Sequence, residues 1–151
     1  MWLQNSSPVV VNTVFKSNLA LSGTGYGGAL YLDNASPSLV NATFTGNLAY
    51  TGAAIFADNG SNFNLSLSTV VDNTYSAIGV TGAVIYMLGG STGTISNSIF
   101  WQCEGVSIEG CSVKFFSGSG ISTTDSCIEG ASVDSVNNIT FGTSEGSPFV
   151  N

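Results

Sequence analysis

The sequence predicts an all-β protein, a parallel β-helix (single-stranded β-solenoid) with coils of about 25–30 residues. Three observations predict this fold. A short segment recurs four times along the chain, each copy leads into a polar turn and a strand pattern, and no segment has the apolar spacing of a helix.

The recurring segment begins at Met1, Leu30, Ile55 and Ile85, so the copies are 29, 25 and 30 residues apart. It reads MWLQNSSP, LYLDNASP, IFADNGSN and IYMLGGST in the four copies. A repeat of this length is typical of folds that stack one small unit on the next. Each copy is therefore expected to form the same part of one coil.

Each unit opens with a glycine-containing step before the apolar strand, at Gly27-Gly28-Ala29, Gly52-Ala53-Ala54 and Gly82-Ala83-Val84. A polar turn follows the strand, for example at residues 33–37 and 58–62, with the Asp, Asn, Gly, Ser and Pro residues that favour turns. The unit thus reads as glycine step, strand and turn.

After the turn, apolar and polar residues alternate with period two over residues 9–15, 39–44, 63–71 and 94–100. This alternation predicts one half-buried strand over each range. A coil is then expected to hold two or three short strands, each pairing in parallel with its equivalent in the next coil.

An asparagine recurs near the end of each unit, at Asn18, Asn47 and Asn73. Asparagine tolerates the left-handed backbone conformation that a sharp corner needs. Its amide also hydrogen-bonds to equivalent amides above and below. We expect these residues to be structural corners that form a ladder.

Two rows of large apolar residues align when the units are superimposed. The first row comprises Trp2, Tyr31, Phe56 and Tyr86, and the second comprises Phe15, Phe44, Val70 and Ile99. We expect the second row to face the core, where each buried large side chain contributes about 1.5–3 kcal/mol. The first row is either core or an exposed aromatic stripe that would suit carbohydrate binding.

The composition excludes several classes of partner. Only 7% of the 151 residues are charged, the net charge is −7, and the only cations are Lys16 and Lys114. Nucleic acids and anionic membranes require clustered Lys and Arg, so neither is an expected partner. No apolar run is long enough for membrane insertion, and no signal peptide is visible.

We expect regular coils over residues 1–101 and irregular C-terminal coils of the same solenoid over residues 102–151. The second region contains Cys103, Cys111 and Cys127, which form either one disulfide plus a free thiol or three buried thiols. Without histidine, their spacing matches no zinc motif, so no metal site or cofactor is expected.

Neither end of the sequence has a polar cap. Met1 aligns with Leu30 inside a coil, and residues 146–151 stop as an apolar strand begins. Uncapped coils associate edge to edge. We therefore expect each end to meet neighbouring β-helix coils of a longer protein or identical subunits of an assembly.

The pairing of Gly27-Gly-Ala-Leu30 with Phe44-Thr-Gly-Asn47 resembles the two tetrapeptide motifs of the chlamydial polymorphic outer-membrane proteins. More broadly, residues 1–101 are similar to the right-handed parallel β-helix repeats of bacterial cell-surface and autotransporter passenger proteins. The resemblance implies a right-handed solenoid whose motifs are scaffold. It departs at Gly52-Ala-Ala-Ile55 and Gly82-Ala-Val-Ile85, which lack the second glycine, and at Val70, which replaces phenylalanine.

An enzyme is the sharpest alternative, but the sequence offers a lyase no Arg and only two isolated lysines as a base. A hydrolase could use paired carboxylates alone. Asp33 and Asp58 share one turn position, so they are expected about 4.8 Å apart, where they would hold a cation or repel each other through water. Glu104, Glu109 and Glu129 surround the cysteine region, where loops would form a cleft. No catalytic residue is assigned.

The sequence thus predicts a non-enzymatic extracellular or cell-surface module, a structural rod or adhesin-like scaffold that binds a glycan or surface protein. One alternative is a filament subunit that stacks head to tail. Another is a polysaccharide-binding or polysaccharide-degrading β-helix.

Overall fold

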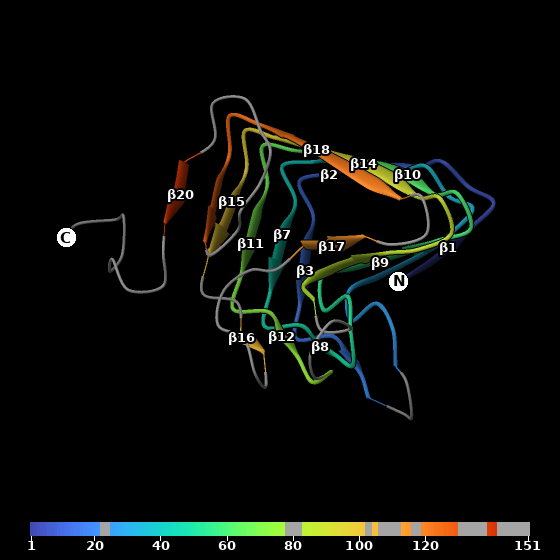
Figure 1. The fold of residues 1–151 in the computed structure, drawn as a ribbon, viewed down its shortest axis with the longest axis horizontal. Coiled ribbons are helices and arrows are strands. Elements are labelled where there is room, and N and C mark those ends of the chain that lie inside the picture. Colours follow the sequence, from blue (N-terminus) through green and yellow to red (C-terminus); the bar gives the residue numbers. More distant parts are fainter. Residues whose placement is uncertain are drawn as a thin grey trace.

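The computed structural model describes residues 1–21, 25–77, 83–101 and 119–127, together with the backbone of residues 104–105, 113–115, 128–129 and 139–141. In these parts of the chain all regular structure is β-strand, and every pair of adjacent strands is parallel. The chain is therefore a β-solenoid, as the repeat predicts (Figure 1).

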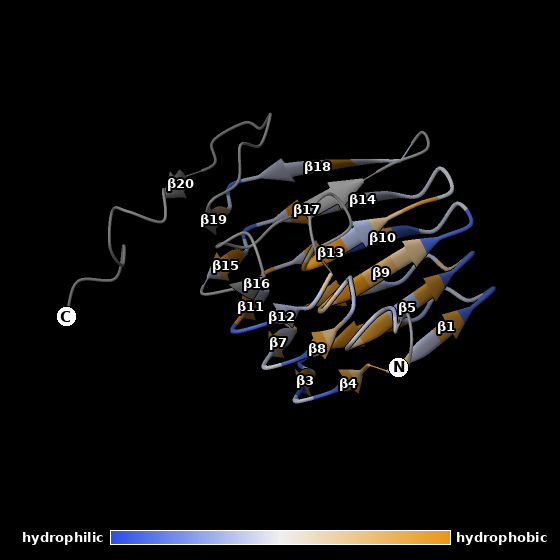
Figure 2. Ribbon diagram, turned by 60° about the horizontal axis from the view of Figure 1, so that its bottom comes forward, coloured by the Kyte–Doolittle hydropathy of each residue, from blue (hydrophilic) through white to orange (hydrophobic). Residues whose placement is uncertain are grey.

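The strands form four sheets that run along the solenoid, here named A to D. Sheet A contains β1 (Trp2–Gln4), β5 (Leu30–Asp33), β9 (Ile55–Asp58), β13 (Ile85–Met87) and β17 (Val113–Phe115). Sheet B contains β2 (Val9–Val11), β6 (Ser38–Val40), β10 (Asn62–Ser66), β14 (Thr92–Ser96) and β18 (Gly120–Thr124). Figure 2 shows the strands of sheet A lying side by side.

Sheets C and D complete the coil. Sheet C contains β3 (Val14–Lys16), β7 (Thr43–Thr45), β11 (Thr69–Val71), β15 (Ile99–Trp101), β19 (Cys127–Glu129) and β20 (Ile139–Phe141). Sheet D contains β4 (Leu19–Ala20), β8 (Leu48–Ala49), β12 (Thr74–Tyr75) and β16 (Glu104–Gly105). A complete coil thus has four strands, and the expectation of two or three was wrong.

Equivalent residues in successive coils are 29, 26, 30 and 28 residues apart along the solenoid. These steps confirm coils of about 25–30 residues. The step from the first coil to the second joins Trp2 to Tyr31 in sheet A and Phe15 to Phe44 in sheet C.

Each predicted strand after the turn is in fact two strands that meet at a corner. Residues 9–15, for example, span β2 and the start of β3. The residue at this corner has a positive φ in every described coil: these residues are Asn12, Asn41, Leu67, Asn97 and Asp125. A single left-handed residue turns the chain from sheet B into sheet C. The next inward side chain follows the corner directly, as Ala42 follows Asn41 and Ser68 follows Leu67, so a pattern read as simple alternation hides the corner.

The recurring asparagines form the predicted ladder but are not the corner residues. The left-handed residues are Ser17, Gly46 and Asp72, each directly before an asparagine of the ladder. The carboxamide of Asn47 accepts from Asn18 Nδ2 at 2.8 Å, and Asn73 accepts in the same way from Asn47. The corner and the ladder thus occupy adjacent positions.

The same amides also hold the backbone of neighbouring strands. Asn47 Nδ2 donates to the carbonyl oxygen of Phe15 at 2.9 Å, and Asn73 Nδ2 donates to that of Phe44 at 2.9 Å. Asn47 and Asn73 are fully buried. Because buried polar groups are costly without partners, this ladder ties each coil to the next.

A second ladder of hydroxyl groups lies between sheets B and C. Ser68 Oγ accepts from the backbone N–H of Ala42 at 3.0 Å, Ser98 Oγ from Ser68 at 3.1 Å, and Ser126 Oγ from Ser98 at 3.2 Å. Each serine also donates to a carbonyl two residues before it, as Ser68 does to Ser66 at 2.8 Å. These bonds satisfy backbone groups that the corner leaves outside the sheets.

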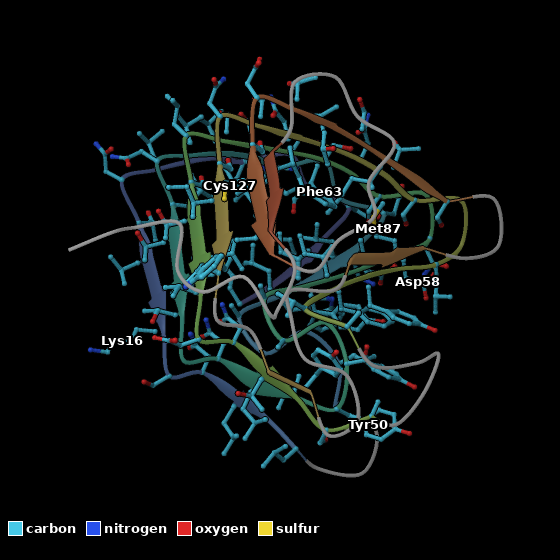
Figure 3. All side chains as sticks on the ribbon, turned by 60° about the vertical axis from the view of Figure 1, so that its left-hand side comes forward. Lys16, Tyr50, Asp58, Phe63, Met87 and Cys127 are labelled. Carbon is cyan, nitrogen blue, oxygen red and sulfur yellow. The ribbon has the colours of Figure 1, made fainter. Side chains whose placement is uncertain are left out.

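The core lies between the sheets and is built from stacks of inward side chains. Figure 3 shows Phe63 and Met87 pointing into it, whereas Lys16 points away. Phe63 lies over Gly93 of the next coil, where an added Cβ would meet its ring at 2.6 Å. A large side chain thus fills the space that the glycine leaves.

The inward row of sheet C comprises Phe15, Phe44, Val70 and Phe100, all buried. The prediction that this row faces the core is confirmed for its first three members. The prediction that Ile99 belongs to this row was wrong. The step from Val70 to its equivalent is 30 residues, so Phe100 takes the place in the row and Ile99 pairs with Thr69. Ile99 is therefore half-buried on the other face of β15.

The irregular C-terminal region is described only through its strands, which extend the four sheets. Cys127 lies half-buried in β19, whereas Cys103 and Cys111 lie outside the described residues, so the predicted states of the thiols stay open. The described part of the chain contains no helix long and apolar enough to cross a membrane.

Candidate binding face

The aromatic row of sheet A faces outward. Trp2, Tyr31, Phe56 and Tyr86 are register partners in neighbouring strands. Their neighbours along each strand, such as Leu30 and Leu32, are fully buried in the core. Side chains alternate between the two faces of a strand, so this row lies on the outer face.

The rings of this row stack along the solenoid. Phe56 stacks on Tyr31 with ring centroids 5.0 Å apart and on Tyr86 at 5.7 Å. Tyr26, from the connection that precedes β5, also stacks on Phe56 at 4.5 Å. We name Trp2, Tyr26, Tyr31, Phe56 and Tyr86 the aromatic face.

Exposure varies along the aromatic face. Phe56 is only 2% exposed although it points away from the core, because Tyr26, Tyr31 and Tyr86 cover it. Tyr26 is 39% exposed and Trp2 is 65% exposed. Phe56 and Tyr86, which is 8% exposed, thus form a small second core with Ala83 outside sheet A, and Trp2 and Tyr26 are the exposed aromatic margins of this face.

The glycine steps bring the connections from sheet D onto this face. Gly52 has a φ of 65°, and an added Cβ would lie 2.7 Å from the carbonyl oxygen of Ile55 and 2.8 Å from Cβ of Phe56. Gly27 has a φ of 68° at the equivalent position. Glycine is required here because the chain turns tightly against the aromatic row.

Two hollows open on the aromatic face. The smaller has a volume of ≈ 70 Å³ and is lined by Tyr26, Tyr50, Thr51, Phe56, Tyr86 and Leu88. None of these side chains is charged at neutral pH. Figure 3 shows Tyr50 at the edge of the coil, below sheet A. The larger hollow, of ≈ 380 Å³, is lined by Trp2, Tyr31 and Asp33.

One polar group in the smaller hollow has no partner. Thr51 is 2% exposed, and its Oγ1 makes no hydrogen bond. Its backbone carbonyl is engaged, because it accepts from the N–H of Gly27 at 3.2 Å. The position of Thr51 is thus fixed by the backbone, while its hydroxyl oxygen is enclosed by the protein without a hydrogen-bond partner.

Two tyrosine hydroxyls of this face, those of Tyr31 and Tyr86, hold their protons more tightly than usual. Burial raises the pKa of Tyr31 above its ordinary value of 10.0, and the carboxylates of Asp58 and Asp33 and the neighbouring Tyr26 raise it further. Burial, followed by Tyr26, also raises the pKa of Tyr86. At neutral pH these hydroxyls therefore both donate and accept hydrogen bonds.

Asp33 and Asp58 lie side by side, as predicted, because they are register partners in β5 and β9. Asp33 accepts from Gln4 Nε2 at 2.8 Å and from Asn59 Nδ2 at 2.7 Å, while Asp58 accepts from the N–H of Asn59 at 2.7 Å. Amide groups thus already engage both carboxylates. The described residues contain no cluster of three possible metal ligands.

Four other acidic residues of the described chain belong to parts of the coil other than sheet A. Asp72 and Asp125 are exposed at left-handed corners. Glu104 and Glu129 lie in β16 and β19, in two different sheets, and their side chains are not described. Glu109 lies outside the described residues, so the predicted cleft around these three glutamates stays untested.

The repeat pattern alone missed Tyr26, Tyr50 and Thr51, which precede the recurring segment. A signal was nevertheless present, since Tyr26 and Thr51 each stand directly before a glycine step. The two residues form an isolated parallel bridge in the structure. Aligning the units on the glycine instead of the strand would have placed them together.

Comparison with protein-family models, curated proteins and solved structures finds no match for this chain. The functional argument therefore rests on the geometry of the fold and of the aromatic face.

Proposed function

We propose that this chain is a non-enzymatic β-helix module of the cell surface or extracellular space, an adhesin-like rod that binds through its long outer face. We further propose that it forms part of a longer protein or assembly. The resemblance of its motifs to the right-handed repeats of autotransporter passengers supports this proposal.

The observation that carries this proposal is the continuity of the hydrogen-bonded ladders. The amides of Asn18, Asn47 and Asn73, of which the last two are buried, link three successive coils, and the hydroxyls of Ser68, Ser98 and Ser126 link three as well. Such ladders resist separation of the coils, because breaking one leaves buried polar groups unpaired. A scaffold needs this property, and catalysis does not.

An adhesion assay tests the proposal directly. Beads coated with the module should adhere to cell surfaces carrying glycans and proteins, and soluble module should compete. Beads coated with heat-unfolded module are the matched control. If the folded module adheres no better than the unfolded one to any surface tested, the adhesin role is contradicted.

A second candidate function, self-assembly, is favoured by the outer side chains of the first coil. Val9, Val11, Val14 and Leu19 are 71%, 48%, 63% and 65% exposed. The equivalents of Val9 in the next coils are Ser38, Asn64 and Thr94, and those of Val14 are Thr43 and Thr69. The second and third coils thus carry polar residues at these two positions, whereas the equivalents of Val11 and Leu19 in the second coil, Val40 and Leu48, are apolar. The exposed apolar residues of the first coil suit burial against a second copy.

Replacing exposed apolar residues of the first coil by their polar equivalents from the second coil tests self-assembly. The double variant Val9→Ser, Val14→Thr carries the residues of the next coil, so it preserves the fold. Sedimentation should show concentration-dependent assembly of the unaltered chain and a smaller tendency in the variant. A monomer at every concentration for both proteins rules this function out.

A further inference from the structure

The smaller hollow contains a buried hydroxyl prepared for a ligand. Thr51 Oγ1 is buried without a hydrogen-bond partner, a state that costs about 1–3 kcal/mol in a folded protein. The hollow beside it has a volume of ≈ 70 Å³. A water molecule occupies about 30 Å³ in the liquid, so a small hydroxylated group fits there.

The lining of the hollow indicates the chemistry of that ligand. Tyr26, Phe56 and Tyr86 present aromatic surface, and Leu88 adds an aliphatic side chain. The tyrosine hydroxyls and Thr51 supply hydrogen-bonding groups without charge. A ligand that suits this lining has apolar C–H groups on one side and hydroxyl groups at its edge, as a sugar ring has.

We propose that the aromatic face binds a neutral carbohydrate, with one sugar hydroxyl entering the smaller hollow and forming a hydrogen bond with Thr51 Oγ1 once the side chains that enclose this oxygen move apart. This inference rests on the proposed function, in which the outer face of the rod binds. The exposed ring of Tyr26 forms the platform for the sugar ring. The inserted hydroxyl satisfies Thr51, which the protein alone leaves unpaired.

Charge selects neutral sugars over acidic ones. Asp33, which lines the larger hollow, and its register partner Asp58 place two carboxylates beside Tyr31. The whole chain carries a net charge of −7 and no arginine. A uronate or sulfated sugar would be repelled here, whereas a neutral hydroxyl donates to a carboxylate such as Asp33. A longer glycan would contact both hollows, since Tyr31 and Phe56 are adjacent.

Two variants separate the ligand role of these groups from a structural one. Thr51→Val keeps the shape of the side chain and removes the hydroxyl, so stability is unchanged or higher. Tyr26→Ala removes a ring that is 39% exposed and that also covers Phe56, so thermal melting checks its fold before binding is measured. Thr43→Val is the matched control, because Thr43 lies on the outer side of sheet C and lines neither hollow.

The probes are hexasaccharides of neutral β-glucan, xylan, mannan and chitin, with hexagalacturonate as the acidic probe, each titrated calorimetrically at up to millimolar concentration. At least one neutral probe should bind. Thr51→Val should weaken that binding by about threefold to tenfold, and Tyr26→Ala by about tenfold or more. Thr43→Val should bind as the unaltered chain does.

Three results would overturn the inference. The first is that no neutral probe binds. The second is that Thr51→Val and Tyr26→Ala both bind the neutral probe as tightly as the unaltered chain does. The third is that hexagalacturonate binds as tightly as the neutral probe. Higher stability of Thr51→Val with unchanged binding would mean that the hydroxyl contacts only water. Each of these leaves the bead assay unaffected, so failure of the carbohydrate site is distinguishable from failure of the adhesin role.

Discussion

Two aromatic rows run along this solenoid, one inside sheet C and one outside sheet A. Inside, Phe15 and Phe44 stack with ring centroids 4.8 Å apart and an interplanar angle of 13°. Outside, Phe56 and Tyr86 stack at 5.7 Å and 11°. The ring geometry is almost the same, so stacking alone does not distinguish a core from a binding surface.

The groups around each row differ instead. The inner row is flanked by the buried asparagine ladder, in which every described amide finds a partner. The outer row is flanked by the carboxylate of Asp33 and by Thr51, whose hydroxyl has no hydrogen-bond partner. The polar neighbours of the inner row thus have partners, whereas the outer row, which we assign to binding, has one polar neighbour without a partner. Two other buried hydroxyls of the described chain, those of Ser91 and Ser119, also lack a partner.

The largest effect is expected from the inner row. Phe44→Ala should lower the free energy of unfolding by about 3–5 kcal/mol, because it opens a cavity in a fully buried stack. Urea unfolding followed by circular dichroism measures this loss. Tyr31→Ala, in the outer row, is the matched variant and should lose much less. Equal losses would show that the two rows have the same role.

The next largest effect is expected from the buried ladder. Asn47→Ala leaves donors of Asn18 and the carbonyl of Phe15 without partners, so it should cost roughly 2–3 kcal/mol. Hydrogen exchange should report faster opening in the coils on both sides. The control is Asn34→Gly, which removes an exposed amide bonded to Asn5 while tolerating the left-handed corner. A similar cost for both would contradict a special role of the buried ladder.

A smaller change, in the stabilising direction, is expected at an outer corner. Leu67 has a φ of 53° and is 60% exposed at a position that Asn41 and Asn97 occupy in neighbouring coils. Leu67→Asn should raise the free energy of unfolding by about 1 kcal/mol, because asparagine tolerates this conformation better. Thermal melting checks the sign. A lower melting temperature would indicate that Leu67 makes a stabilising contact.

The smallest effect concerns pH and the outer row. The pKa values of Tyr31 and Tyr86 lie above 10 in the folded chain, so the unfolded chain loses these protons first. Their contribution to stability is therefore complete below about pH 10 and is lost as pH rises through the folded pKa values. The urea midpoints at about pH 8 and about pH 11 should differ less in the double variant Tyr31→Phe, Tyr86→Phe than in the unaltered chain. An unchanged difference would contradict the assignment.

Much of the fold could be predicted from sequence because each coil repeats the same physical demands. The segments beginning at Met1 and Leu30 align in register as expected, and Asn18, Asn47 and Asn73 form the expected ladder. Strand number per coil was harder to predict. A left-handed residue such as Asn12 bends the chain without interrupting the apolar pattern, so two strands read as one.

The candidate site was less predictable. The repeat identified the row of Trp2, Tyr31, Phe56 and Tyr86 but left its direction open, because an aromatic residue suits either face of a strand. Tyr26 and Thr51 reach this row only through a turn at a glycine with positive φ and a bridge between coils. Such a contact depends on the path of the connection, which the periodic pattern does not contain.

The central claim, that the inner row stabilises the fold and the outer row binds, is tested most directly by aromatic NMR shifts. The measurement is a titration of the assigned chain with the neutral hexasaccharide that binds best. We expect shifts for Tyr26, Tyr31, Phe56 and Tyr86 and none for Phe15, Phe44 and Phe100. Shifts that are absent from the outer row, or equally large in the inner row, would contradict the account.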